Sequence, residues 1–424
     1  MNQPLSRYVD YMYSYPHKTA YRPFPAPVSL LPYLEQLQGR KASLYFHIPF
    51  CSHKCGYCNL FSLQTNRTEY IATYLDTLHR QAQQLSPLTA GLTFDSFAIG
   101  GGPPLLLTVP QLEQLMATAA LFGVHPSHAF TSVETSPEYA DRPRLNVLKK
   151  AGVSRVSIGI QSFQDEELKA IKRRPRQNTI YQALDDIRQM DFPYFNIDLI
   201  YGIKGQTVES FLYSLEEALR FQPNELFIYP LYVRQGTGIT EREPDDVCFR
   251  MYRAACKLLQ AKGFLQTSMR RFIHHPSTDA EVSCGDEVML SCGSGGRSYL
   301  GDLHYATRYT VCQQCIAREI DEYMATTDFT VARNGFILSA KEQQQRFIIK
   351  NLMYYMGIDK AEYTRRFGEP LDRTPLFRQL AEQYWIEETP ERIRLTPEGL
   401  GYSDYIGQLF ITPEIRQLME TYSY

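Results

Sequence analysis

The sequence lacks the features that mark nucleic-acid-binding and membrane proteins. Its 44 basic and 46 acidic residues leave a formal net charge of −2, so there is no excess of positive charge to attract polyanions. No uncharged apolar run reaches the roughly 18 residues that a membrane span needs. The N-terminus also lacks the basic start and apolar run of a signal peptide. We therefore expect a cytoplasmic protein whose partners include neither nucleic acid nor a membrane.

Tryptophan and cysteine are also scarce. There is one Trp, but 30 Tyr and 23 Phe supply aromatic surface for ordinary cores or for a large flat pocket. Nine cysteines in 424 residues suit a reducing compartment better than a disulfide scaffold. A chain of this length exceeds a single core, so we expect two or three domains.

Three of the cysteines are closely spaced in segment 44–61, LYFHIPFCSHKCGYCNLF. Cys51, Cys55 and Cys58 directly follow an apolar run that predicts a strand. Three thiolates on one tight loop can each bind one iron of a four-iron cubane and leave the fourth iron open to a small molecule. The alternatives are inert buried cysteines, or a zinc site completed by a nearby histidine such as His53 or His47.

Apolar runs and segments of helical period alternate between residues 41 and 245. The predicted strands are 43–48, 94–99, 130–134, 154–160, 195–201 and 225–232, and the clearest helices are 69–86, 111–122 and 208–221. This alternation predicts an α/β fold whose right-handed crossovers build a parallel sheet that curls into a partial (β/α)6 TIM-like barrel. Reactive groups on such a fold lie at the carboxyl ends of the strands, as the cysteine loop does.

The pattern divides the chain into four parts: an N-terminal arm (1–40), the partial barrel (41–245), a connecting region (246–330) and a helical domain (331–424). The arm has no sustained period and is expected to be extended and pinned to the barrel by its aromatic residues. Alternatively, its His17, Lys18 or Arg22 lines an active site. The connecting region begins with a predicted helix at 246–262, which an irregular segment follows.

The last part of the chain is predominantly helical. Helices are predicted at 341–356, 375–384 and 397–410, with a short strand pair near 384–386 and 392–396. Helices followed by a small hairpin suggest a winged-helix-like unit. Because it has no basic stripe, we expect this unit to pack on the barrel or to cover a substrate rather than to bind nucleic acid.

The C-x3-C-x2-C spacing, with Tyr57 directly before the last Cys, resembles the signature of the radical S-adenosylmethionine (SAM) superfamily. This resemblance implies that Cys51, Cys55 and Cys58 bind a [4Fe-4S] cluster whose open iron chelates SAM. One electron from the cluster would then cleave SAM to methionine and a 5′-deoxyadenosyl radical. It also implies a reductant such as flavodoxin or ferredoxin as a partner.

Further segments resemble the SAM-binding motifs of that superfamily. Gly101 and Gly102 end the second predicted strand in GGGPP, which is similar to the GGG-T-P segment that contacts the SAM amino group. Pro103 stands where that motif usually has Thr. Glycines at a strand end also let the backbone approach a ligand closely, although a tight turn is the plainer alternative. Glu134 ends the third strand in VETSP, which is similar to E-x-N-P.

The resemblance continues at the next two strands. Gln161 lies in GIQSF, and Asp198 lies in NIDLIYGIKGQT, whose carboxylate is implied to reach the SAM ribose. Lys204 replaces a usual Pro in that segment. Arg173, in IKRRPRQ, falls where relatives place an Arg near the SAM carboxylate, a role that suits a guanidinium. A solvated basic turn is the alternative for Arg173.

These motifs cover about residues 40–410 in the order typical of the oxygen-independent coproporphyrinogen III oxidase-like (HemN-like) branch, and in particular of a bacterial subgroup of it. The resemblance implies hydrogen abstraction from a small-molecule substrate, foremost oxidative decarboxylation of a coproporphyrinogen-like tetrapyrrole. A methyltransferase that uses two SAM molecules and a haem-binding chaperone are the alternatives. Leu60 stands where the coproporphyrinogen enzyme has a further Cys.

Two further groups of residues are candidates for the site. Tyr45 and His47 precede the cysteine loop and are predicted to face substrate or cofactor as catalytic groups, with a structural role for His47 as the alternative. Cys284, Cys292, Cys312 and Cys315 could form an auxiliary cluster or zinc site, or they are ordinary free thiols. Cys248 and Cys256 are expected in the core.

Overall fold

The protein is built around one large mixed sheet, seen in a computed structural model that describes residues 7–8, 14–124, 128–174, 176–274, 288–371 and 375–423. The strand order is β1-β15-β14-β13-β12-β2-β5-β6-β7-β8-β9-β11-β10. All six predicted strands are present: β2 (Lys41–Ile48), β5 (Thr93–Gly101), β6 (Phe130–Thr135), β7 (Arg155–Gln161), β8 (Tyr194–Tyr201) and β9 (Glu225–Pro230). They pair in parallel and in sequence order, which confirms the predicted α/β fold.

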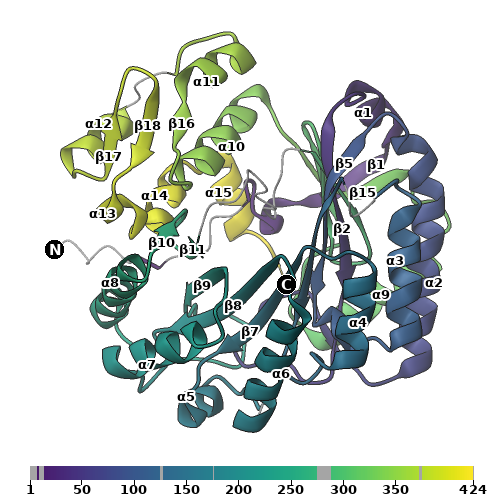
Figure 1. Cartoon of the computed structure of the whole chain (residues 1–424). Coiled ribbons are helices and arrows are strands. Elements are labelled where there is room, and N and C mark those ends of the chain that lie inside the picture. The colour runs from purple at the N-terminus through teal and green to yellow at the C-terminus, as the bar shows by residue number, and fades with distance from the viewer. Residues whose placement is uncertain are drawn as a thin grey trace.

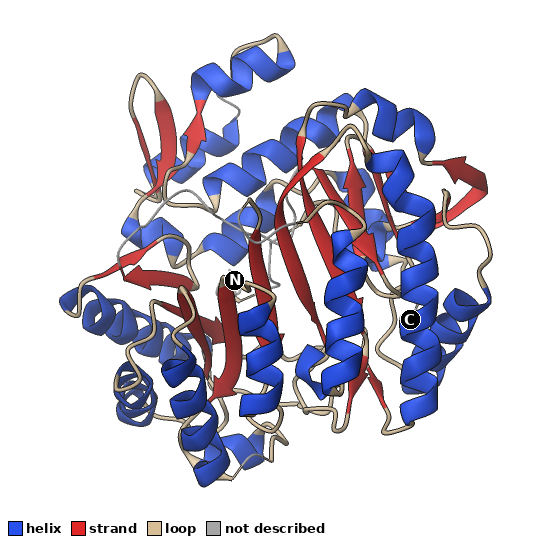
Figure 2. Ribbon diagram, turned by 45° about the vertical axis from the view of Figure 1, so that its right-hand side comes forward, coloured by secondary structure: helices blue, strands red, loops and turns tan. Residues whose placement is uncertain are grey.

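Helices pack along the parallel strands (Figures 1 and 2). They are α2 (Thr68–Leu85), α3 (Val109–Ala120), α4 (Arg142–Lys150), α5 (Asp165–Ala170), α6 (Gln177–Met190), α7 (Val208–Leu219) and α8 (Asp245–Ala261). Helix α2 buries Ile71, Leu75, Leu78 and Ala82, which recur every three or four residues and so share one face. Among the described helices, none is both long enough and apolar enough to cross a bilayer.

The connecting region and the arm extend the sheet, so the prediction of an irregular segment after residue 263 is wrong. The connecting region adds β10 (Phe264–Gln266), β11 (Arg271–His274), β12 (Val288–Cys292), β13 (Arg297–Leu300), β14 (Leu303–Ala306) and α9 (Gln313–Ala325). The start of the last part adds β15 (Val331–Ile337). Strand β12 pairs in parallel with β2, and β15 pairs with β1 (Arg22–Ser29) of the arm, which α1 (Leu31–Gln36) follows. Within the described ranges the edge strands β1 and β10 do not pair, so the sheet stays open.

The C-terminal part forms a second core and appears as a separate group at the upper left of Figure 1. It contains α10 (Ala340–Leu352), α11 (Lys360–Phe367), α12 (Pro375–Glu382), α13 (Pro397–Leu400), α14 (Ser403–Leu409), α15 (Pro413–Glu420) and the small sheet β16 (Ile358–Asp359), β18 (Arg392–Leu395), β17 (Ile386–Glu388). The predicted strand pair is confirmed, but the helix predicted at 397–410 is two helices. A buried ion pair between Arg270 and Asp404 ties this part to the main sheet.

Candidate cluster and cofactor site

The cysteine loop leaves the carboxyl end of β2 and is held on two sides. Cys51 ends the short strand β3 (Phe50–Cys51), which pairs with β4 (Leu63–Gln64) at the far end of the loop. At its tip, the Gly56 N–H donates to the Ile171 carbonyl at 3.0 Å, and the Gly56 carbonyl accepts from the Gly238 N–H at 2.7 Å. These backbone bonds fix the loop without using any of the three thiols.

One cavity of about 500 Å³ opens beside this loop at the carboxyl ends of the parallel strands. The structure brings every predicted site residue to its wall: Tyr45, His47, Cys51, Cys55, Cys58, Gly101, Gly102, Glu134, Gln161, Arg173 and Asp198. They meet because the ends of neighbouring parallel strands lie along one edge of the sheet.

The three thiols are suited to act as ligands of an iron–sulfur cluster. All three are free, and burial raises the pKa of Cys51 to about 12 and raises the pKa of Cys58 as well. A thiolate at these positions therefore needs a cation beside it to replace its proton. Nowhere in the described ranges do three Cys, His, Asp or Glu side chains converge as one metal ion requires. A cubane takes one thiolate per iron, so this arrangement fits a cluster better than a single zinc ion.

The end of β5 passes very close to the cysteine loop. The Gly102 N–H donates to the Ile48 carbonyl at 2.7 Å, and a Cβ on Gly102 would lie 2.0 Å from the Phe50 carbonyl oxygen and 3.0 Å from Cys51 Sγ. Gly101 has φ +113°, a conformation that favours glycine. Only glycine therefore lets this strand end line the cavity next to the thiols.

Gln161 carries backbone strain at the end of β7. Its φ is +77°, and the pairing with β8 shifts register between Gly159 and Gln161. Its side-chain amide oxygen is buried and has no protein partner. A strained residue that aims an unsatisfied acceptor at a cavity is typical of ligand-binding sites.

Arg173 lies in the cavity wall rather than in a solvated turn. Its guanidinium donates to the Tyr57 hydroxyl at 3.2 Å and to the Gly159 carbonyl, and one nitrogen lies 3.6 Å from Cys55 Sγ. Its neighbours Lys172 and Arg174 are exposed. The geometry thus supports the first of the two predictions made for Arg173.

Two carboxyl groups face the cavity, and both resist ionisation. Desolvation and the nearby Asp198 raise the pKa of Glu134 to about 7, and desolvation raises the pKa of Asp198 to about 6. Protein surrounds Glu134, but its side chain is exposed to the cavity. Water in the cavity therefore reduces the rise in its pKa. At neutral pH these groups can accept or donate hydrogen bonds to a polar ligand.

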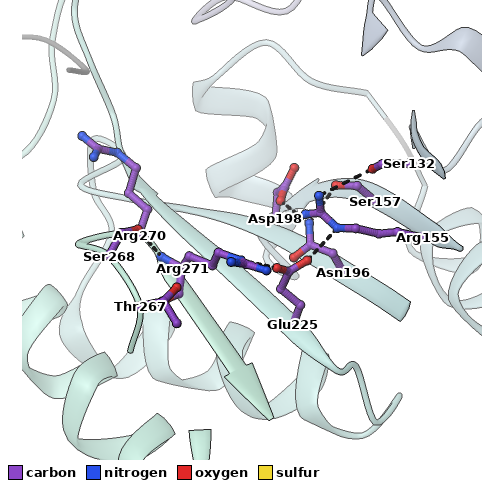
Figure 3. A network of polar contacts seen from close by, with 10 residues as sticks. All are labelled: Ser132, Arg155, Ser157, Asn196, Asp198, Glu225, Thr267, Ser268, Arg270 and Arg271. Atoms are coloured by element: carbon purple, nitrogen blue, oxygen red, sulfur yellow. Dashed lines mark hydrogen bonds and ion pairs between the residues drawn. The ribbon is translucent and has the colours of Figure 1, made fainter. Parts of the chain in front are cut away.

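A polar network beneath Asp198 fixes its orientation (Figure 3). The Asn196 amide donates to Asp198 and to Ser157, each at 2.7 Å. Arg155 pairs with the buried Glu225 at 2.6 Å, and Arg271 pairs with the other oxygen of Glu225. Because Glu225 lies between two guanidinium groups, its burial is compensated, and the floor of the cavity stays rigid.

His47 is held by the protein on both ring nitrogens. Nε2 lies 2.9 Å from the Phe61 carbonyl, and Nδ1 lies 3.1 Å from the Tyr45 hydroxyl. The carbonyl can only accept, so Nε2 carries the proton and Nδ1 accepts from Tyr45. Burial lowers the pKa of His47 to about 4, so it stays neutral. This geometry favours the structural role that was the alternative for His47.

The rim of the cavity contains residues that the motifs did not identify. His17 and Lys18 of the arm contribute to it, with the Lys18 ammonium 3.6 Å from the centre of the Tyr309 ring. Arg234, in the loop after β9, and Arg297, at the start of β13, add positive charge. His17 and Lys18 had been weighed as site residues. Arg234 and Arg297 lie in segments that the resemblance covers, YPLYVRQGTG and GSGGRSY, but had not been named as site residues.

Among the residues described, the other cysteines do not form a site for a single metal ion. Cys292 is fully buried in β12, whereas Cys312 is exposed and Cys315 partly exposed at the start of α9. Cys284 lies outside the described residues. Cys248 is buried and Cys256 half-buried on α8, as the prediction of core positions requires.

Comparisons with known proteins agree with this site. The Radical SAM superfamily model matches residues 45–218, and the HemN C-terminal domain model matches residues 338–401. The oxygen-independent coproporphyrinogen III oxidase of Salmonella typhimurium is 30% identical over 394 residues, which cover 85% of this chain and 83% of the relative. The heme chaperone HemW of Bacillus subtilis is 27% identical over 386 residues, which cover 87% of this chain and 100% of the relative.

A solved structure shares the fold. Coproporphyrinogen III oxidase (HemN) from Escherichia coli superposes with a TM-score of 0.82 at 23% identity, covering 94% of this chain and 96% of that one. With the family matches, the chain belongs to the radical SAM superfamily, whose members use a [4Fe-4S] cluster and SAM. Within that superfamily it lies in the HemN-like branch, as the motifs predicted.

Proposed function

We propose that the protein is a radical SAM enzyme that holds its cluster at Cys51, Cys55 and Cys58 and binds SAM along the ends of β5 to β8. The observation that carries this proposal is the single cavity where these thiols face the polar ends of four successive parallel strands. When bound, the cluster and SAM together supply an adenosyl radical that removes a hydrogen atom from the substrate.

The residues of the cavity then have distinct tasks. Gly101 and Gly102 let the backbone approach the amino group of SAM, and Arg173 offers a guanidinium to its carboxylate. Asp198, oriented by Asn196, accepts from a ribose hydroxyl. The polar network beneath Asp198 keeps these contacts in place.

The substrate we propose is a tetrapyrrole that carries carboxylates. The relatives are named for coproporphyrinogen III and for heme, and the rim places Lys18, Arg234 and Arg297 around a cavity large enough for part of such a molecule. The first reaction we propose is removal of a propionate hydrogen atom, followed by loss of CO2 and transfer of the remaining electron to a one-electron acceptor, which leaves a vinyl group. We also propose that the protein works in the cytoplasm with a flavodoxin or ferredoxin as electron donor.

A haem-chaperone function is the second candidate, because the alignment covers the whole length of the HemW relative. Leu60, which replaces the further Cys of the coproporphyrinogen enzyme, also weighs against the oxidase. A methyltransferase of this branch would differ from both in its products.

Anaerobic incubation with SAM, dithionite and a panel of porphyrinogens and haem separates these functions by mass spectrometry. We expect 5′-deoxyadenosine to form in proportion to a modified tetrapyrrole, with CO2 released from a porphyrinogen. S-adenosylhomocysteine would identify a methyltransferase. Haem binding without 5′-deoxyadenosine coupled to a product would replace the enzyme proposal with the chaperone. The Cys312→Ser variant serves as a thiol control that keeps the three cluster ligands.

A further inference from the structure

A second pair of cysteines lies at the surface, at the start of a long helix. Cys312 is the residue that precedes α9, and Cys315 lies within its first turn. Cys312 is exposed and Cys315 partly exposed, and three residues along the helix place them on the same face. Two thiols one helical turn apart have the C-x2-C spacing of dithiols that close to a disulfide.

The surroundings favour a thiolate at Cys312. Hydrogen bonding from the Cys315 thiol, and then from the backbone N–H groups of Cys315 and Gln314, lowers the pKa of Cys312. Donation of that hydrogen bond raises the pKa of Cys315. Cys256, buried on α8, has its pKa raised to about 12 by desolvation. The two surface thiols therefore differ from the core cysteine and from each other.

We propose that Cys312 and Cys315 form a redox-active dithiol that exchanges with the disulfides of small thiols such as glutathione, with Cys312 as the attacking sulfur. The Cys312 thiolate attacks the disulfide and forms a mixed disulfide, which releases one small thiolate. Cys315 then loses its proton and attacks Cys312 Sγ, closing the protein disulfide and releasing the second thiolate. The protein loses two electrons and two protons, and one disulfide molecule becomes two thiols.

The pair is well placed to report its state to the cysteine loop. The Val311 carbonyl, next to Cys312, accepts from the Lys54 ammonium at 2.9 Å. The Gln313 side chain accepts from the Gln64 N–H at 2.7 Å and donates to the Ser62 carbonyl at 2.9 Å. Closing the disulfide would shift Val311 and Gln313, which hold the loop at Lys54 and just beyond its end at Ser62 and Gln64. Oxidation of the dithiol by small disulfides thus changes how firmly the protein retains the cluster.

The first test equilibrates the full-length protein, cluster loaded and oxygen-free, with glutathione buffers of increasing oxidation. After acid trapping, peptide mapping should find one reversible two-electron transition that links Cys312 to Cys315. Either Cys312→Ser or Cys315→Ser should abolish the link, and Cys256→Ser should keep it. If no linked peptide forms even in fully oxidised glutathione, the dithiol proposal is wrong, whatever the outcome with SAM.

The second test identifies the attacking sulfur through alkylation by iodoacetamide at neutral pH. Cys312 should react about three to ten times faster than Cys315, and Cys315→Ala, which removes the donor beside Cys312, should slow it. Equal rates would overturn its assignment as the attacking sulfur.

A third measurement tests the coupling, by following release of iron to a chelator from the oxidised and reduced forms. We expect faster release from the oxidised form, and no difference between oxidising and reducing buffers in the Cys312→Ser/Cys315→Ser double variant. Identical rates in the wild-type protein would remove the coupling from the proposal.

Discussion

Cys55 and Cys58 share their C-x2-C spacing with Cys312 and Cys315, yet the two pairs have opposite surroundings. The first pair lines the cavity, where burial raises the pKa of Cys58. The second begins a helix at the surface, where hydrogen bonds lower the pKa of Cys312. We propose that the same spacing supplies cluster ligands in one place and an exchangeable dithiol in the other. Desolvation and hydrogen bonding decide between the two.

The sharpest test of this contrast substitutes one cysteine from each pair. Cys58→Ala should abolish the broad visible absorption of the reconstituted protein, its cluster iron and its cleavage of SAM, because a cubane held by two thiolates is easily lost. Cys315→Ser should retain all three. Iron analysis and the yield of 5′-deoxyadenosine check the pair, and a full iron complement in a Cys51/Cys55/Cys58 triple alanine variant would disprove the cluster assignment.

The next effect concerns the close approach behind the cysteine loop. Gly102→Ala should destabilise the fold by at least about 3 kcal/mol and shift Cys51, since the added methyl overlaps the Phe50 carbonyl. Gly123→Ala is the matched control. It meets no atom within 4 Å, and with φ +70° it should cost only about 1 kcal/mol. Denaturant unfolding and iron content measure both, and similar losses in the two variants would contradict the contact.

A smaller effect tests whether the cavity disfavours ionisation of a carboxyl group as it does of a thiol. Burial raises the pKa of Glu134 to about 7, so its contribution to stability is full below its unfolded pKa and is lost as pH rises through 7. Glu134→Gln has no such dependence. Without SAM, the stability of the variant relative to the wild type should therefore rise by about 1 kcal/mol from about pH 5 to about pH 8. This is less than the full shift would give, because water in the cavity weakens it. Thermal melting of both proteins at the two pH values measures the change, and an equal stability difference at both would refute the prediction.

The smallest effect concerns the bond between the two cysteine sites. Lys54→Gln removes the ammonium that donates to the Val311 carbonyl, and this half-exposed contact should be worth less than about 1 kcal/mol. The difference in iron release between oxidised and reduced protein should shrink in this variant. Lys150→Gln, at an exposed helix end, should leave that difference intact, and the chelator assay distinguishes them.

Much of the fold was predictable because burial imposes a period on the sequence. The six parallel strands are continuous apolar runs, and α2 and α7 show a clear helical period. Helix α6 was not predicted, although Ile180, Leu184 and Ile187 carry the same period. The strands of the connecting region are only three to five residues long, and a run that short cannot be assigned without its distant partner.

The site was predictable to the extent that it follows strand ends. Glu134 and Gln161 lie at the ends of β6 and β7, and Asp198 lies within β8 opposite Gly159, so the pairing of neighbouring parallel strands brings them together. Arg234 follows the end of β9 and so obeys the same rule, whereas Arg297 begins β13, whose position depends on the complete sheet. The contrast between the two C-x2-C pairs was also inaccessible, since burial is a property of the fold and not of spacing.

The pairing of β12 with β2 has a consequence for how the molecule forms. The strand that leads into the cysteine loop gains its second neighbour only from residues 288–292, late in the chain. Contacts between such distant segments form slowly, because a long loop must close first. During synthesis, the loop with Cys51, Cys55 and Cys58 therefore emerges well before its final walls exist. That delay gives iron–sulfur delivery a period in which the three thiols are accessible.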